Sequence, residues 1–130
     1  MSGLSYMQEQ LMQRLSPLEK TAENAYCARI TFEPGFPSFD GHFPGRPVVP
    51  AICQLSVVEI MARLITGCRD ARVREILNMK FKAPLLQGDT ASFAASVDRA
   101  GDSVPVIRAV VSTQSRQDVA RMRLALDLEK

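Results

Sequence analysis

Residues 40–59 read DGHFPGRPVVPAICQLSVVE, and this stretch carries most of the information about the fold. It contains the chain's only histidine, His42, in a segment with three prolines that leads into a long apolar run. Each proline fixes φ and lacks a backbone donor, so the segment before residue 51 is neither an ordinary helix nor a central strand. We therefore expect a rigid loop that presents a group titrating near neutral pH beside a helix N-terminus.

The apolar run after this loop predicts a buried helix. From about residue 51 to residue 66, apolar side chains occupy nearly the whole circumference at 100° per residue, and Gly67 is well placed as a C-terminal cap. Ser56, Glu59 and Arg63 share one narrow sector, while Gln54 stands apart. A buried charge needs a partner, so Glu59 is expected either to pair with Arg63 beside a dimer groove or solvent, or to line a cavity.

The rest of the chain reads mainly as strands. Alternation of apolar and polar residues predicts strands over about 26–32, 73–83 (with a bend near Asn78), 90–98, 104–114 and 118–128. Leucine and methionine spacing over residues 4–15 predicts an amphipathic helix near the N-terminus. A strand, a long helix and then a meander of strands is an α+β order, which one antiparallel sheet wrapped around one long central helix satisfies.

Two motifs resemble a known family. Residues 41–50, GHFPGRPVVP, are similar to the signature of the 3-hydroxyacyl-[acyl-carrier-protein] dehydratases, which are hotdog-fold enzymes of fatty-acid synthesis. Residues 78–89, NMKFKAPLLQGD, resemble that family's strand–turn–strand segment. The resemblance covers roughly residues 25–128. It implies a single hotdog domain over residues 1–130, preceded by an N-terminal helical segment over residues 1–20.

The resemblance also implies where the chemistry lies. In the family the catalytic pair is the loop histidine, here His42, and an acid fourteen positions later, where this chain has Ser56. The nearest acid on the helix is Glu59, one turn further on. Ala51 stands where the family has a glycine whose N–H faces the thioester carbonyl. We therefore name His42, Glu59 and Ser56 as candidate catalytic residues. The candidate substrate-binding residues are Ala51, Phe43, Gly45, Val49 and Gln54.

Three functions fit these residues. The first is dehydration of a 3-hydroxyacyl thioester in fatty-acid or specialised lipid or polyketide-type synthesis. In that reaction His42 removes the proton next to the carbonyl and the Ala51 N–H stabilises the developing oxyanion, while Ser56 can only position a water. The second is a hotdog thioesterase, and the third is a non-catalytic subunit that binds acyl chains or acyl carrier protein.

The resemblance further implies a homodimer, and possibly a higher oligomer. The substrate would be carried on the phosphopantetheine of acyl carrier protein or on CoA, and the protein would need no cofactor of its own. Acyl carrier proteins are acidic, so basic residues are candidate docking charges: Arg46, Arg72, Arg74, Lys80 and Lys82.

Composition narrows the remaining classes. The chain has 130 residues, 46% of them hydrophobic and 23% charged, which fits one soluble globular domain. A net charge of +2 without a basic block gives no reason to expect nucleic acid. Three cysteines without CxxC spacing and one histidine argue against a metal site or a disulfide framework. We find no transmembrane span or signal peptide and expect a cytoplasmic protein with reduced thiols.

Overall fold

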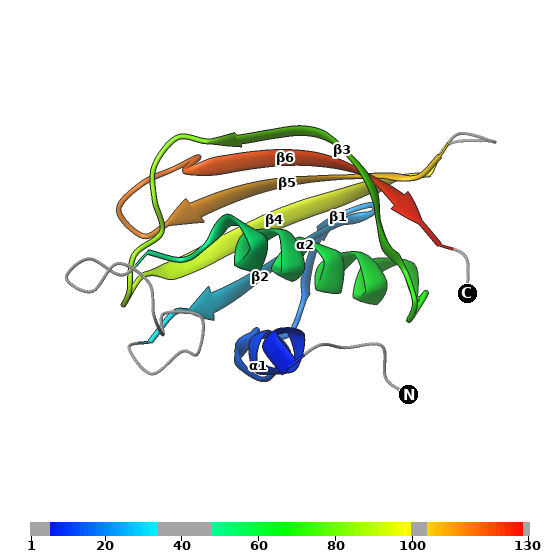
Figure 1. Cartoon of the computed structure of the whole chain (residues 1–130). Helices are drawn as coiled ribbons and strands as arrows, with labels where there is room; N and C mark the ends of the chain where they lie inside the picture. Colours follow the sequence, from blue (N-terminus) through cyan, green and yellow to red (C-terminus); the bar gives the residue numbers. More distant parts are fainter. Residues whose placement is uncertain (1–5, 34–47, 100–103, 129–130) are drawn as a thin grey trace.

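The computed structural model describes residues 6–33, 48–99 and 104–128, and Figure 1 shows the whole chain. The described residues form helices α1 (Tyr6–Arg14) and α2 (Ala51–Thr66), and strands β1 (Glu19–Ala22), β2 (Ala25–Thr31), β3 (Arg72–Phe81), β4 (Thr90–Asp98), β5 (Val106–Thr113) and β6 (Ala120–Asp127). The predicted loop residues His42, Phe43, Gly45 and Arg46 lie outside the described residues.

The strands form one antiparallel sheet in the order β1-β2-β4-β5-β6-β3. Figure 1 shows the sheet curving over α2, with α1 beside α2. Alternate residues of β4 and of most of β6 are buried, because one face of the sheet packs on the helix and the other faces away from it. This is the predicted hotdog arrangement, a sheet wrapped around one long helix, and the prediction is confirmed.

Helix α2 has the predicted bounds and is mostly buried. Eight of its side chains are buried, and the six apolar ones pack with the inward residues of the strands in one core. Gly67 adopts the left-handed conformation with φ of 74°, and its N–H donates to the Arg63 carbonyl at 3.0 Å. A residue with a Cβ is disfavoured at such an angle, which explains glycine at this cap. The sequence predicted a helix that is buried all round, and this prediction is wrong, because Ile52 and Leu64 are exposed.

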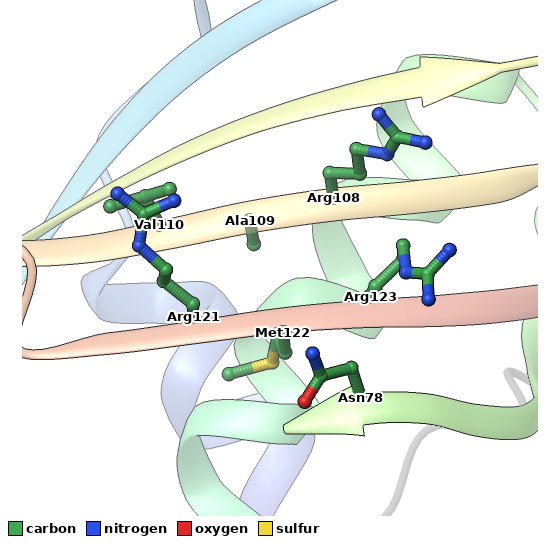
Figure 2. Close-up of a pocket in the computed structure, with 7 residues that line it drawn as sticks. All are labelled: Asn78, Arg108, Ala109, Val110, Arg121, Met122 and Arg123. Carbon is green, nitrogen blue, oxygen red and sulfur yellow. The ribbon is translucent and has the colours of Figure 1, made fainter. Parts of the chain in front are cut away.

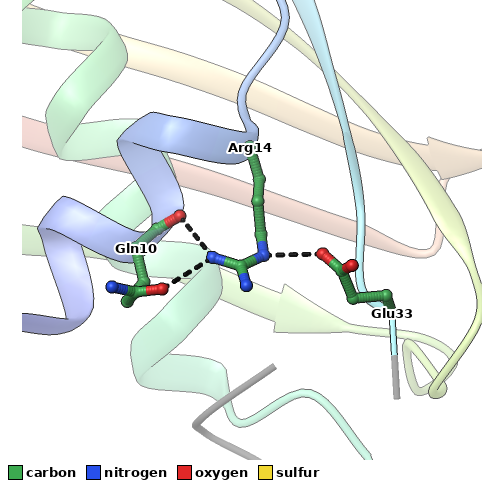
Figure 3. A network of polar contacts seen from close by, with 3 residues as sticks. All are labelled: Gln10, Arg14 and Glu33. Carbon is green, nitrogen blue, oxygen red and sulfur yellow. Dashed lines mark hydrogen bonds and ion pairs between the residues drawn. The ribbon is translucent and has the colours of Figure 1, made fainter. Parts of the chain in front are cut away.

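The N-terminal helix packs onto the core. Leu11 of α1 is fully buried, as the predicted amphipathic pattern requires. The far end of α1 is tied to the residues after β2, because Arg14 Nε donates to Glu33 Oε1 at 2.7 Å, and Arg14 Nη1 also donates to Gln10 (Figure 3). Glu33 is half exposed, so this ion pair contributes at most about 1 kcal/mol, and the burial of Leu11 contributes more.

Two features of the sheet bear on the predictions. The predicted bend near Asn78 is confirmed, since the β3–β6 register shifts between Val73 and Glu75 and again between Ile76 and Asn78. Strand β1 is absent from the predictions. It has only four residues, all of them exposed, so no alternation of buried and exposed positions marks it in the sequence.

Candidate functional site

The N-terminus of α2 presents unpartnered backbone donors. Pro50 is the N-cap residue and provides no side-chain cap, and its carbonyl accepts the N–H of Cys53 and of Gln54. Within the described part of the chain, the N–H groups of Ala51 and Ile52 donate to no acceptor. The first turn also carries no acidic residue, so nothing on the helix offsets the positive end of its dipole. This end of α2 can therefore stabilise negative charge.

A cleft of about 290 Å³ opens beside this helix end. Backbone contacts fix its two walls relative to each other: the Val49 N–H donates to the Leu85 carbonyl at 2.8 Å, and Val48 forms an isolated bridge with Leu86. One wall is the entry to α2 and the other is the segment that follows β3. The lining residues are Val48, Val49, Ala51, Gln54, Phe81, Lys82, Ala83 and Pro84.

Gln54 is the buried polar group of this cleft. Gln54 is 2% exposed, and its Oε1 accepts no hydrogen bond within the described part of the chain. A buried acceptor without a donor costs about 1–3 kcal/mol, so such groups in native proteins call for an explanation. A ligand that fills the cleft and brings a donor would remove this cost.

Glu59 lies one and a half turns further along α2 and has a different environment. Its Oε1 accepts from Gln8 Nε2 of α1 at 2.9 Å and lies 3.5 Å from Arg63 Nη2. Its Oε2 accepts the Val73 N–H of β3 at 2.8 Å. Both carboxylate oxygens are therefore occupied, and Glu59 joins α1, α2 and β3.

The Arg63 side chain completes this network. Its Nε donates to the Ala71 carbonyl at 2.8 Å, which holds the chain just before β3 against α2. Of the two interpretations of Glu59, the predicted pairing of Glu59 with Arg63 at i,i+4 spacing is present, and Glu59 does not line the described cleft.

The structure thus brings together three of the predicted site residues: Ala51, Val49 and Gln54 line one cleft. Ser56 is buried at 8% exposure and, like Glu59, is not among the residues that line it. Roles for His42, Phe43 and Gly45 stay predictions, because these residues lie outside the described part of the chain.

Sequence reasoning missed several participants. Phe81 and Pro84 line the cleft, and Lys82, predicted only as a docking charge, lines it too. Gln8 was not connected with Glu59, because 51 residues separate them and no local pattern links them. For Phe81 and Pro84, the motif over residues 78–89 was the available signal, since it marked this turn as part of the resemblance.

A charged cluster lies beside the cleft. Asp118 accepts from Lys82 Nζ at 2.6 Å and from Arg121 Nε at 2.7 Å. These hydrogen bonds, first that from Lys82 and then that from Arg121, lower the pKa of the Asp118 carboxyl below its ordinary value of 3.8. The carboxylate is thus held ionised, and it fixes the Lys82 side chain at the cleft wall.

The sheet order and central helix define a protein of the hotdog class, and solved structures agree. The dehydratase heterocomplex ApeI:P from Xenorhabdus doucetiae matches with a TM-score of 0.70 at 21% identity, covering 85% of this chain and 93% of that chain. The Escherichia coli PaaI protein from the phenylacetic acid degradation operon matches with a TM-score of 0.67 at 17% identity, covering 92% and 86%. At these identities the likeness shows the fold.

Sequence comparison gives the family. Residues 18–123 match the ApeI-like family, described as ApeI dehydratase, and the chain belongs to this family. It is also 28% identical over 106 residues to the 3-hydroxyacyl-[acyl-carrier-protein] dehydratase FabZ of a Wolbachia species from Drosophila simulans, covering 77% of this chain and 72% of that protein. Matches to the proteins of that name from two Rickettsia bellii strains span 48% of their length. The predicted relationship to these dehydratases is confirmed.

No helix in residues 6–33, 48–99 and 104–128 is long and apolar enough to cross a membrane. None of the cysteines Cys27, Cys53 and Cys68 forms a disulfide within the described residues.

Proposed function

We propose that this protein dehydrates 3-hydroxyacyl thioesters and that the cleft at the start of α2 holds the thioester. Membership of the ApeI-like dehydratase family supports the reaction class. The observation that carries the location is the coincidence, in one cleft, of an uncapped helix N-terminus and a buried acceptor without a partner. The N–H groups of the helix N-terminus suit an oxyanion, and the Gln54 oxygen suits a hydrogen-bond donor on the substrate.

In the proposed reaction, His42 removes the proton next to the thioester carbonyl, the carbonyl oxygen gains negative charge, and the Ala51 N–H donates to it. The hydroxyl on the next carbon then leaves as water and a carbon–carbon double bond forms. The proton that the hydroxyl needs must come from a group of suitable pKa. The protonated imidazole of His42 is such a group, whereas the Ser56 hydroxyl is far too weak an acid.

Glu59 remains the other predicted acid, and its surroundings support a positioning role instead. A general acid must carry a proton, but both Glu59 oxygens accept hydrogen bonds, and one lies beside Arg63. Protonation would weaken the contacts to Arg63, Gln8 and Val73 together. We therefore propose that Glu59 holds α1 and β3 against α2, and that one histidine serves as both base and acid.

Gln54 is proposed to bind the substrate. Its Oε1 can accept either from the 3-hydroxyl group or from an amide N–H of the pantetheine chain, both of which are donors on the proposed substrate. The carrier is proposed to be acyl carrier protein, which the name of the FabZ relatives contains, or CoA. We propose that the reaction takes place in the cytoplasm.

We further propose a homodimer formed through β3. Within the described residues β3 pairs with β6 on one side only, and nearly all of its side chains are exposed. Ile76, Leu77 and Phe81 are between 38% and 49% exposed on this edge. A long edge strand that is unpaired on one side and exposes apolar side chains favours association, and pairing β3 with a second copy would cover it. Sedimentation velocity tests this: a dimer is expected, and a monomer at micromolar concentration would overturn it.

The test of the reaction is mass spectrometry of the purified protein incubated with 3-hydroxyacyl and saturated acyl thioesters. Loss of one water from the hydroxyacyl substrates, abolished by His42→Ala, supports the proposal. Release of free acid and thiol would favour the thioesterase, and binding without turnover would favour the non-catalytic subunit. A second arm repeats the assay with candidate partner proteins, because ApeI:P is a heterocomplex.

A further inference from the structure

Two arginines face each other on the outer side of the sheet. Arg108 of β5 and Arg123 of β6 are directly opposite partners in the register, and both are exposed on the side away from α2. Figure 2 shows both guanidinium groups extending beyond the strands on the same side. The neighbours of this row are neutral: Asn78 pairs with Arg123 on one side, and Ser96 pairs with Arg108 on the other.

This pair has no counterion within the described residues. Neither Arg108 nor Arg123 forms an ion pair there, and no acidic side chain lines the depression of about 180 Å³ between them. Along the chain from Arg123, Asp127 lies four residues away, opposite Arg72, and Asp118 lies five residues away, where Lys82 and Arg121 bind it. Like charges placed opposite each other on neighbouring strands destabilise a sheet, so their presence here has a cost that the folded chain itself does not offset.

The basic surface continues toward the proposed site. Two residues along β6, Arg121 lies opposite Lys80 of β3, and two residues beyond Lys80 is Lys82, which lines the cleft. Adjacent positions on one face of a strand are about 7 Å apart, so the basic side chains follow one another at short spacing. Arg121 and Lys82 share the Asp118 carboxylate, which leaves a net positive charge at this end of the row. We call Arg108, Arg123, Arg121 and Lys80 the basic strip. It runs over the outer sheet face and ends at the edge where the cleft opens.

We propose that the basic strip is the docking surface for an acidic protein, which, resting on the proposed function, is the acyl carrier that delivers the thioester. Guanidinium groups suit carboxylate partners because they form paired, planar hydrogen bonds and lose little hydration. A strip that ends at the cleft would place a carrier beside the opening. The strip differs from the docking set predicted from the sequence, since Arg72 and Arg74 lie at the opposite end of β3, and Arg72 is opposite Asp127.

The test uses the double variant Arg108→Gln/Arg123→Gln in the full chain, with Arg69→Gln as control. Arg69 is an exposed arginine in the turn between α2 and β3, at the far end of the sheet. Turnover is measured with one hydroxyacyl group on the carrier protein and on N-acetylcysteamine. For the carrier substrate we expect KM to rise about tenfold at low salt with kcat unchanged, since two docking charges contribute on the order of one factor of ten. The small thioester should show no change, and neither should the control.

An unchanged KM for the carrier substrate in the double variant would overturn the proposal, as would equal losses with both substrates. Fluorescence anisotropy with labelled acidic carrier separates docking from catalysis. If the protein turns over no substrate but the double variant alone loses carrier binding, the proposed reaction fails and the docking surface stands. A parallel titration with a short DNA duplex tests the other polyanion. Preferential binding of DNA through Arg108 and Arg123 would overturn the assignment to an acidic protein.

Discussion

Two polar residues of α2, Gln54 and Glu59, differ in how their side-chain oxygens are hydrogen-bonded. Near the start of the helix, Gln54 has an acceptor without a donor, and the Ala51 N–H is free within the described residues. Five residues beyond Gln54, about 7.5 Å along the axis and about 140° around it, Glu59 has both oxygens hydrogen-bonded. Glu59, with donors to both oxygens, stabilises the fold, whereas the Gln54 oxygen lacks a donor and lies in a cleft, so a ligand can supply one. Arg63 Nη1 also lacks a partner within the described residues, but Arg63 does not line that cleft.

The largest effect is expected from removing the satisfied group. Glu59→Leu leaves the partly buried Arg63 beside an apolar side chain and removes the acceptor of Gln8 Nε2 and of the Val73 N–H. Losing this partly buried ion pair together with two hydrogen bonds should lower the free energy of unfolding by about 3 kcal/mol, which urea denaturation measures. The double variant Glu59→Leu/Arg63→Leu should recover part of this loss. Wild-type stability together with lost dehydration would instead identify Glu59 as the catalytic acid.

The next effect comes from removing one donor at the site end. Ala51→Pro deletes the backbone N–H, and proline is well tolerated in the first turn of a helix. Pro50 already has ψ of 151°, the extended conformation that a residue before proline prefers. We expect kcat to fall about 100-fold, the effect of losing one oxyanion donor, with the urea midpoint unchanged. Ala51→Ser keeps the N–H and should retain most activity. Full activity in Ala51→Pro would show that this N–H does not face the thioester.

Gln54→Leu sharpens the contrast with Glu59→Leu. Because Oε1 has no donor within the described chain, we expect the free energy of unfolding to stay the same or rise by about 1 kcal/mol. Thioester binding should weaken about fivefold, since one neutral hydrogen bond to the ligand contributes about 1 kcal/mol. Isothermal titration with a non-hydrolysable thioester analogue measures this. Destabilisation comparable to that of Glu59→Leu would mean that Gln54 is a structural residue too.

The smallest effect concerns Asp118, whose carboxylate is bound by Lys82 and Arg121. Its pKa is lower in the folded chain than its ordinary value of 3.8, so its contribution to stability is present above that value and is lost as pH falls through the folded pKa. Asp118→Asn should therefore flatten the loss of stability below about pH 4, as thermal unfolding at a series of pH values will show. An unchanged acid limb would show that these surface contacts contribute nothing measurable.

The sequence predicted those helices and strands that a local pattern of residues marks. Helix α2 and strand β4 have the predicted bounds because their periodicity is strong and because Gly67 ends the helix. The motif from His42 onward placed the candidate site at the start of α2. The sequence could not predict contacts between segments that are far apart along the chain. The Gln8–Glu59 hydrogen bond and the apposition of Gln54 with the segment after β3 depend on tertiary packing, which no pattern along the chain encodes.

The Glu59–Arg63 pair was predictable from its i,i+4 spacing, but contacts between charged residues far apart in the sequence were not. The sequence placed Lys82 among exposed docking charges, but its ion pair with Asp118 and its position in the cleft wall arise from a turn packed against the β5–β6 hairpin. The opposed pair of Arg108 and Arg123 requires the strand register, which alternation alone leaves open by two residues.

The most direct test is a single-turnover reaction of a 3-hydroxyacyl thioester with the wild-type protein and the Ala51→Pro, Gln54→Leu and His42→Ala variants, followed by mass spectrometry. We expect the wild type to form the unsaturated thioester with loss of water, His42→Ala to form none, and the two cleft variants to form it more slowly. Unchanged rates in all three variants, or a substrate left intact by the wild type, would contradict the assignment of this cleft as a dehydratase site.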